Sequence, residues 1–258
     1  MPQIGHQYYE EHGQGFPLVL LHGHTLDRRM WADLIPPLAT RFRVITPDLA
    51  GHGRSGQAPD GDALADDLAG LLKRLSIPRA AVCGLSMGGG IAVSFALHYP
   101  EMCGALVPVD AALFGWQYTD WPGTRPYVKI ARSEGLAPAL AAWLADPLFA
   151  PVLASGVGPQ VRQIVSEFPG EIWLRPANPP APPGRPEVDR LGEIGAPTLV
   201  VVGERDLPDF RRMADKLAAE VPGARLAVVP GAGHLVPLEA PAALSALLLE
   251  FLTPLSGA

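Results

Sequence analysis

The stretch Gly84-Leu85-Ser86-Met87-Gly88 has the pattern Gly-x-Ser-x-Gly and follows an apolar run that begins at Ala80. The next segment, residues 87–98, has the composition of a helix, so Ser86 is expected where a strand turns into a helix. Residues two positions before and after a serine at such a tight turn must be small, and Gly84 and Gly88 meet that need. The turn would project the Ser86 hydroxyl from the sheet, at a helix N-terminus that favours developing negative charge. Glycine and serine also form ordinary loops, but in this context the motif predicts that Ser86 is a nucleophile.

Short apolar runs alternate with segments of helical periodicity on both sides of this motif. This alternation predicts an α/β fold with a mostly parallel sheet covered by helices. The predicted strands are residues 17–22, 42–47, 80–84, 104–109, 197–202 and 225–229. The predicted helices are residues 30–41, 62–75, 87–98, 209–220 and 241–252.

The alternation fails between Ala111 and Arg190. This region holds four of the five tryptophans, Trp116, Trp121, Trp143 and Trp173, and closes with the proline-dense stretch 175–186. Such a stretch cannot continue a helix or a central strand. We therefore expect residues 111–190 to form a helical cap, or lid, inserted into a core made of residues 1–110 and 191–258. The tryptophans either pack the cap or form the wall of a substrate pocket, and sequence does not separate these roles.

A serine nucleophile needs a base, and the base needs an acid that orients it. Asp206 follows the predicted strand 197–202 and His234 follows the strand 225–229, so both are expected in loops at the carboxyl edge of the sheet. We predict His234 as the general base and Asp206 as the acid. Asp110, which follows the strand 104–109, is the alternative acid. Asp209 fits better as the N-cap of the next helix.

An acyl-transfer enzyme also needs donors for the oxyanion of the tetrahedral intermediate. The backbone amide of Met87, directly after the nucleophile, is one candidate. The other is the amide of His24, in the loop after the first predicted strand. His22 is expected to brace this loop by hydrogen bonds, and the segment 48–55 to form a structural turn.

Composition and charge limit the classes of function. The 258 residues carry 20 Lys and Arg against 26 Asp and Glu, a formal net charge of −6, so no nucleic-acid partner is expected. Neither a signal peptide nor an apolar run of about 18 residues is present, so no membrane span is expected. Cys83 and Cys103 lie in apolar runs and need no disulfide, which favours a cytoplasmic protein. The sequence has no spaced His/Cys cluster that would predict a metal site.

As a set, these motifs resemble the α/β-hydrolase superfamily, in its serine-hydrolase branch. The matching residues are His22-Gly23-His24, Asp48 to Ser55, Gly84 to Gly89, Gly203 to Asp206 and Gly233-His234. The resemblance implies an α/β-hydrolase fold with an eight-stranded, mostly parallel sheet, and a Ser-His-Asp mechanism without a cofactor. Serine at the turn disfavours haloalkane dehalogenases and epoxide hydrolases, which are built around aspartate there.

A narrower similarity concerns the substrate. Residues 25–31, 41–44 and 48–55 are similar to the N-terminal region of 3-oxoadipate enol-lactonases, which suggests a small carboxylic ester or lactone. The cofactor-free haloperoxidase relatives usually carry a proline in the oxyanion loop, and His24-Thr25-Leu26 has none.

Two other functions stay open. One is hydrolysis of a carbon–carbon bond in a dienoate-type diketone, whose carboxylates would favour basic residues in the pocket. The basic residues available in the cap are Arg125, Lys129, Arg132 and Arg175. The other is a ligand-binding relative that keeps the triad without turnover. The oligomeric state is not predicted.

Overall fold

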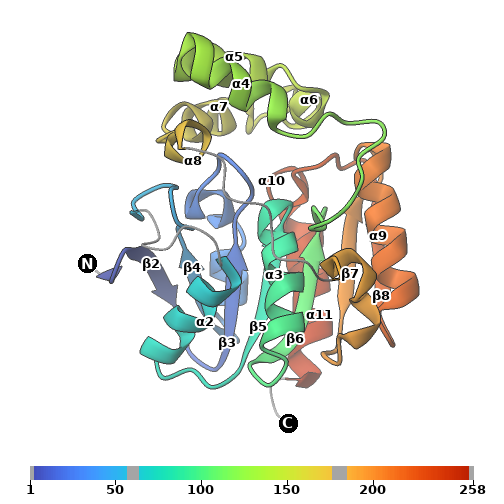
Figure 1. Cartoon of the computed structure of the whole chain (residues 1–258). Coiled ribbons are helices and arrows are strands. Elements are labelled where there is room, and N and C mark those ends of the chain that lie inside the picture. The colour runs from blue at the N-terminus through green and yellow to red at the C-terminus, as the bar shows by residue number, and fades with distance from the viewer. Residues whose placement is uncertain (1–2, 57–63, 176–184, 256–258) are drawn as a thin grey trace.

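The computed structural model describes residues 3–56, 64–175 and 185–255, and a sheet forms its centre (Figure 1). The strands are β1 (Gln3–Ile4), β2 (Gln7–His12), β3 (Phe16–Leu21), β4 (Phe42–Pro47), β5 (Ala80–Leu85), β6 (Cys103–Val109), β7 (Leu199–Gly203) and β8 (Arg225–Val229). Their order in the sheet is β1-β2-β4-β3-β5-β6-β7-β8. All pairs from β4 to β8 are parallel, whereas β2 runs antiparallel to β4 and β1 antiparallel to β2. Seven strands thus form the main sheet and the two-residue β1 extends its edge, which confirms the mostly parallel architecture.

The central strands consist mainly of apolar residues, because helices cover both faces of the sheet and bury the side chains on each. Every residue of β5 and β6 is buried, as expected of parallel strands between two layers of helices. The strand β2 was not predicted, because its sequence Gln-Tyr-Tyr-Glu-Glu-His has no continuous apolar run. It lies near the edge of the sheet, where it buries Tyr8 and Tyr9 and pairs with β4.

Helices cover the sheet on both sides. They include α2 (Leu64–Arg74), α3 (Met87–His98), α9 (Pro208–Glu220), α10 (Val236–Glu239) and α11 (Pro241–Leu252). Figure 1 shows α2 and α3 in front of the sheet and α11 behind it. The bounds of α3 and α11 agree with the predictions, whereas the predicted start of α2 at Asp62 lies outside the described residues.

The single helix predicted over residues 30–41 is wrong. The chain instead forms a 3₁₀ turn, η1 (Arg28–Trp31), and one short helix, α1 (Ile35–Leu38). Pro36 and Pro37 stand in the first turn of α1, where their missing N–H groups cost no helical hydrogen bond. In a helix that began at Met30 both prolines would interrupt the hydrogen bonding and clash with the preceding turn.

Between β6 and β7 the chain is helical, as expected. It forms α4 (Arg125–Glu134), α5 (Leu136–Leu144), η2 (Pro147–Phe149), α6 (Ala150–Leu153), α7 (Gly158–Ser166), α8 (Glu171–Leu174) and η3 (Glu187–Asp189), followed by η4 (Leu191–Glu193). Figure 1 shows α4 to α8 above the ends of the strands. We call residues 111–190 the cap segment; of its proline-dense stretch, residues 176–184 lie outside the described residues. That the cap segment is a distinct domain stays a prediction.

The described helices include no single one that is long and apolar enough to cross a membrane. Two neighbouring helical segments, α5 and residues 147–153, are together long and apolar enough for such a span, but the chain bends by 58° between them.

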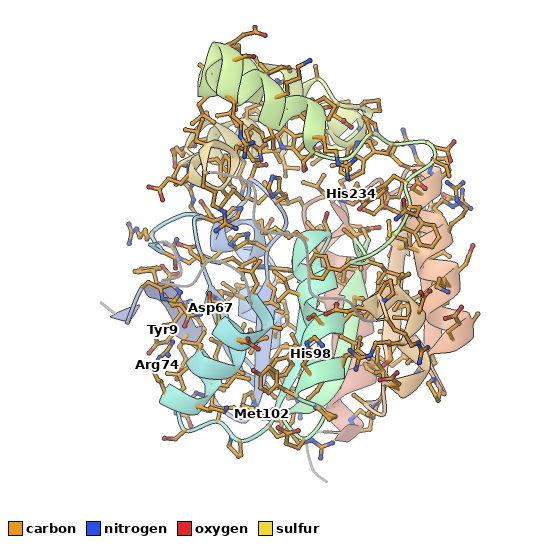
Figure 2. The ribbon with its side chains drawn as sticks, in the orientation of Figure 1. Tyr9, Asp67, Arg74, His98, Met102 and His234 are labelled. Atoms are coloured by element: carbon orange, nitrogen blue, oxygen red, sulfur yellow. The ribbon has the colours of Figure 1, made fainter. Side chains whose placement is uncertain are left out.

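The end of the sheet that faces the cap segment carries the candidate site. Figure 2 shows His234 at this end, whereas His98 and Met102 lie toward the opposite end. Loops after the carboxyl ends of parallel strands are where ligands bind in open α/β sheets, so the fold brings the residues that follow β5, β7 and β8 together there.

Candidate active site

Ser86 lies at a strained turn between β5 and α3. Its φ is +53° and its ψ is −113°, a region that residues other than glycine rarely adopt. Hydrogen bonds hold the turn, because Ser86 N donates to Val109 O at 2.9 Å and Ser86 O accepts from Gly90 N at 3.0 Å. A Cβ atom at Gly84 would collide with the Gly88 carbonyl across the turn. The backbone therefore has the tight turn that the pentapeptide predicts, and both glycines are needed for it.

His234 and Asp206 are joined behind this turn. His234 Nδ1 donates to both carboxylate oxygens of Asp206, at 3.0 and 2.9 Å. Both residues are buried, at 2% and 6% exposure, and the Phe210 ring packs against the imidazole with 4.2 Å between centroids. The bond fixes the tautomer that carries its proton on Nδ1 and leaves Nε2 as an acceptor.

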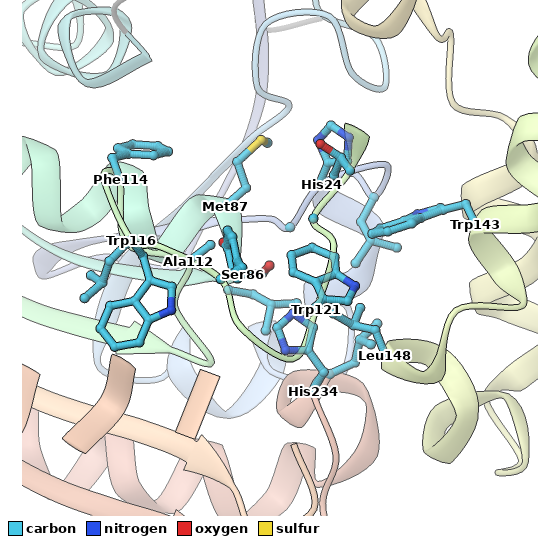
Figure 3. A pocket seen from close by; sticks show the side chains of 18 of the residues that line it. His24, Ser86, Met87, Ala112, Phe114, Trp116, Trp121, Trp143, Leu148 and His234 are labelled. Carbon is cyan, nitrogen blue, oxygen red and sulfur yellow. The ribbon is translucent and has the colours of Figure 1, made fainter. Parts of the chain in front are cut away.

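The other nitrogen of His234 is unpaired. Among the described residues, His234 Nε2 is buried and has no hydrogen-bond partner. It belongs to the same cavity as Ser86, and Figure 3 shows both side chains at the cavity wall. In unliganded enzymes the hydrogen bond between base and nucleophile is often long and tightens only with substrate bound. A buried acceptor that faces the cavity can take up the Ser86 proton.

Glu239 holds the loop that carries His234, and sequence reasoning did not single it out. Its two carboxylate oxygens accept from Gly233 N at 2.8 Å and from Leu235 N at 3.0 Å, the amides on either side of the histidine. Hydrogen bonds to a charged acceptor are stronger than neutral ones. An acidic residue five positions after a histidine forms no recognisable motif, so only the structure reveals this clamp.

Asp110, the alternative acid, lies next to the pair instead of taking its place. One ligand atom each of Asp110, Asp206 and His234 lies within 4.8 Å of the others. Asp110 Oδ1 accepts from Gly203 N at 2.7 Å, while Oδ2 has no hydrogen bond among the described residues. Complete burial, and then the negative charge of Asp206, raise the pKa of Asp110 well above its usual value. Because two carboxylates buried so close together disfavour each other's ionisation, we expect Asp110 to be the carboxyl that holds a proton.

These three residues also have the donor atoms of a metal site. Their arrangement is accounted for by the two hydrogen bonds between His234 and Asp206 and by the bond that Asp110 accepts from Gly203 N. Occupation of His234 Nδ1 by a metal would remove the bond that orients the imidazole.

The loop after β3 is held by side chains from both the core and the cap segment. His22 Nε2 accepts from Leu49 N at 2.9 Å, so His22 braces this loop as expected. Thr25 has a φ of +60°, which is strained for a β-branched residue. Its hydroxyl donates to His24 O at 2.6 Å and accepts from the indole of Trp143 at 2.7 Å. These bonds hold the strained loop that presents the His24 amide.

The segment 48–55 is a structural turn around a buried carboxylate. Asp48 is fully buried and accepts from the backbone amides of Arg28 and Arg54, at 2.9 and 2.8 Å. Its second oxygen also forms a salt bridge with the Arg28 side chain at 3.1 Å. These contacts agree with the expected structural role.

The four cap tryptophans are anchored by their indole N–H groups. Trp116 donates to Asp209, Trp121 to Asp146, Trp143 to Thr25 and Trp173 to His24, over distances of 2.6 to 3.2 Å. The sequence left their role open between packing and pocket wall. In the structure Trp116, Trp121 and Trp143 line the cavity, and Trp173 packs behind His24 with 5.7 Å between ring centroids.

Asp209 is not the N-cap of its helix, which corrects the prediction. The helix α9 begins at Pro208, and the Asp209 carboxylate reaches the cap segment instead. It accepts from the backbone amides of Thr119, Asp120 and Trp121 at 2.8 to 3.2 Å. Burial alone would raise the pKa of Asp209, but these bonds and those from Trp116 and Arg212 outweigh it and lower the pKa.

A cavity of about 390 Å³ lies between the sheet end and the cap segment. Its floor contains Ser86, Met87, His24 and His234, and its walls are mainly aromatic and aliphatic side chains of the cap segment (Figure 3). This volume and lining are typical of small-molecule sites. The five residues proposed from sequence for the site therefore lie in or directly behind one cavity, with Asp206 the one behind. Their roles stay predictions.

Comparison with known proteins identifies the family. The family model described as alpha/beta hydrolase fold matches residues 17–241. The chain belongs to the α/β-hydrolase family. This membership agrees with the resemblance seen in the motifs and with the order of the strands.

Several characterised proteins are similar to this α/β-hydrolase. The structure of a thermophilic esterase from Thermogutta terrifontis has 30% sequence identity, covers 97% of this chain and 94% of that one, and gives a TM-score of 0.79. An enol-lactonase from Burkholderia xenovorans has 26% identity, 96% coverage of both chains and a TM-score of 0.80. The 2-hydroxymuconate semialdehyde hydrolase of Pseudomonas sp. (strain CF600) is 31% identical over 95% of this chain and 90% of its own length. These similar proteins thus include an esterase, an enol-lactonase and a semialdehyde hydrolase.

Proposed function

We propose that this α/β-hydrolase is a serine hydrolase that cleaves small carboxylic esters or lactones. Ser86 is the nucleophile, His234 the general base, and Asp206 the acid that orients the imidazole. The observation that carries the proposal is the state of His234. Its Nδ1 is bound to Asp206, while its buried Nε2 is unpaired and shares the cavity with Ser86.

The reaction proceeds by acyl transfer. His234 Nε2 takes the Ser86 proton as Oγ attacks the substrate carbonyl, and the amides of His24 and Met87 hold the resulting oxyanion. When the tetrahedral intermediate collapses, the bond to the leaving oxygen breaks and that oxygen takes the proton from His234. A water molecule then gives a proton to His234 and attacks the acyl carbon. As the bond between Ser86 Oγ and that carbon breaks, His234 returns the proton to Oγ and the acid is released.

The similar esterase and enol-lactonase structures support this chemistry. The relative named for 2-hydroxymuconate semialdehyde keeps carbon–carbon bond hydrolysis as the alternative. That alternative requires recognition of a carboxylate, and no observation in the cavity favours it. A non-catalytic receptor is the second alternative, since such a relative can keep the triad; stoichiometric binding without turnover would identify it.

The test is hydrolysis of 4-nitrophenyl butyrate by the wild type and by Ser86→Ala. Loss of the hydroxyl should lower kcat/KM by at least about a thousand-fold. The matched control is Ser94→Ala, on the same helix, whose hydroxyl donates to Glu187 at 2.7 Å and does not line the cavity. This control should keep most of the activity. Equal rates in the wild type and Ser86→Ala would refute the proposal.

A further inference from the structure

Charge is absent from the described wall of the cavity. Among the described residues that line it there is no Lys, Arg, Asp or Glu. Its groups able to titrate are His24, His234 and Tyr118. A substrate that enters this cavity therefore meets no fixed charge unless one of these side chains ionises.

Neither histidine supplies a positive charge to a bound substrate. His24 Nε2 accepts from the Trp173 indole at 2.6 Å, which requires that nitrogen to be unprotonated. Burial, and then the proximity of His22, lower the pKa of His24 to about 4. His234 is needed as a neutral base, and its other nitrogen is bound to Asp206.

The basic residues of the cap segment lie elsewhere. Arg125, Lys129 and Arg132 line an open depression on the cap that adjoins the cavity at Thr124, but none of the three lines the cavity itself. Arg132 is further held by the cap backbone, since its Nε donates to Trp173 O at 2.9 Å and its Nη2 donates to Arg175 O at 2.5 Å. Arg175 is not among the residues that line the cavity. The segments outside the described residues, 1–2, 57–63, 176–184 and 256–258, contain no Lys, Arg or His in their sequence.

The polar atoms of the tryptophans that line the cavity are also engaged. The indole nitrogens of Trp116, Trp121 and Trp143 donate to Asp209, Asp146 and Thr25. These rings therefore offer carbon surface to a substrate. A carboxylate placed against these rings would lose part of its hydration and gain neither a cation nor an indole donor, which is unfavourable.

We infer that the substrates of this site are esters or lactones whose acyl part is uncharged and apolar, and that carboxylate-bearing acyl groups are excluded. The inference rests on the proposed function. It removes the dienoate-type diketones, which carry a carboxylate, and any lactone that bears one. The apolar rings bind the hydrocarbon chain of the acyl group, and Ser86, His234 and the two amides act on the carbonyl.

The experiment compares two substrates with the same acyl chain and leaving group, one neutral and one charged at the far end of the chain. The first is methyl 4-nitrophenyl adipate, and the second is 4-nitrophenyl hydrogen adipate, whose free carboxylate replaces the methyl ester. Both release 4-nitrophenol, so kcat/KM is measured in the same way near neutral pH. We expect the neutral substrate to be favoured at least about 100-fold, because an unpaired charge is desolvated in only one of the two complexes.

A pair of variants tests whether the lack of a cation in the cavity causes the preference for the neutral substrate. Phe114 lines the cavity and is 42% exposed, so it tolerates a charged replacement (Figure 3). Phe114→Arg should narrow the preference for the neutral substrate by about tenfold by pairing with the carboxylate. Phe114→Gln, the matched control without charge, should leave the preference unchanged.

The outcomes separate this inference from the proposed function. Equal kcat/KM for the two substrates, with Ser86→Ala inactive on both, would overturn the inference and leave the serine hydrolase intact. Narrowing of the preference by Phe114→Gln as much as by Phe114→Arg would also overturn it, because charge would not be the cause. Hydrolysis of both substrates by Ser86→Ala at the wild-type rate would overturn the proposed function itself.

Discussion

The end of the sheet and the cap segment meet at one cavity, but they are held in place by different means. At the sheet end the backbone positions the site residues, through the strained turn at Ser86 and the loops that follow β7 and β8. In the cap segment hydrogen bonds of side chains position the aromatic rings, because each of the four tryptophans donates one indole hydrogen bond. We therefore expect the proposed chemistry to depend on the fold, and substrate choice to depend on a few side chains of the cap segment.

The largest effect should come from the acid at the sheet end. Asp206→Asn should lower kcat by about 10⁴-fold, because an amide no longer holds His234 in its working tautomer. Asp110→Asn should lower kcat by less than about tenfold, since an amide mimics the neutral acid by accepting from Gly203 N and donating with its NH₂ group. Steady-state kinetics with 4-nitrophenyl butyrate distinguish them.

The same pair settles which carboxyl is the triad acid. Should Asp110→Asn be as damaging as Asp206→Asn while both variants unfold at the wild-type denaturant midpoint, then Asp110 shares the role of orienting His234. The sheet end would in that case depend on a carboxyl pair and not on one residue.

The motifs at the sheet end could be read from sequence because each depends on local chain geometry. Gly84 is required because a Cβ atom there would collide with the Gly88 carbonyl across one turn, and the apolar runs of β5 and β6 follow from burial on both faces. The short α1 could have been foreseen as well, because Pro36 and Pro37 end any helix that begins at Met30. By contrast, β2 depends on its partner β4, so its own residues give little signal.

The anchors of the cap segment could not be read from sequence, because they join residues far apart in the chain. Asp209 looked like a local N-cap, yet its carboxylate binds backbone amides 88 to 90 residues away. Likewise, Trp173 reaches His24 across 149 residues. A pattern within one segment cannot reveal such contacts, so the use of the tryptophans became clear only in the structure.

A smaller effect, on stability and substrate binding, should follow removal of the Asp209 carboxylate, which accepts several hydrogen bonds from the cap segment. Asp209→Ala leaves three backbone amides, of which that of Trp121 is buried, and the Trp116 indole without their acceptor. We expect the free energy of unfolding to fall by about 3 kcal/mol, since several charge-assisted hydrogen bonds are lost together. KM should rise several-fold while kcat changes little, because the cap residues of the cavity wall become less well ordered while the triad residues keep their positions. Urea unfolding and steady-state kinetics measure the two effects.

The matched control for this prediction is Asp215→Ala, a change of the same residue type on the same helix α9. Asp215 is exposed, so its replacement should have little effect on stability or KM. A drop in kcat with an unchanged KM for Asp209→Ala would contradict the separation between cap segment and sheet end, because the anchor would then support the chemistry.

The smallest effect is a pH dependence at the junction of the two regions. The imidazole of an unfolded chain binds a proton below a pKa of about 6.5, whereas folded His24 keeps its pKa near 4. Between these values the unfolded state binds more protons, so the free energy of unfolding should fall as the pH is lowered from about 6.5 to about 4. Above about 6.5 the contribution is complete, and it amounts to at most about 3 kcal/mol. Unfolding by urea at several pH values measures this fall.

The variant that isolates His24 in this pH dependence is His24→Gln, whose amide oxygen can still accept from the Trp173 indole. It should show a shallower fall of stability with pH, while the part due to His22 and His52 remains, because burial also lowers the pKa of both. Stability is the informative readout, because protonation of His234 would lower activity at acid pH whatever His24 does. An unchanged slope in His24→Gln would mean that the junction between His24 and Trp173 carries no proton linkage.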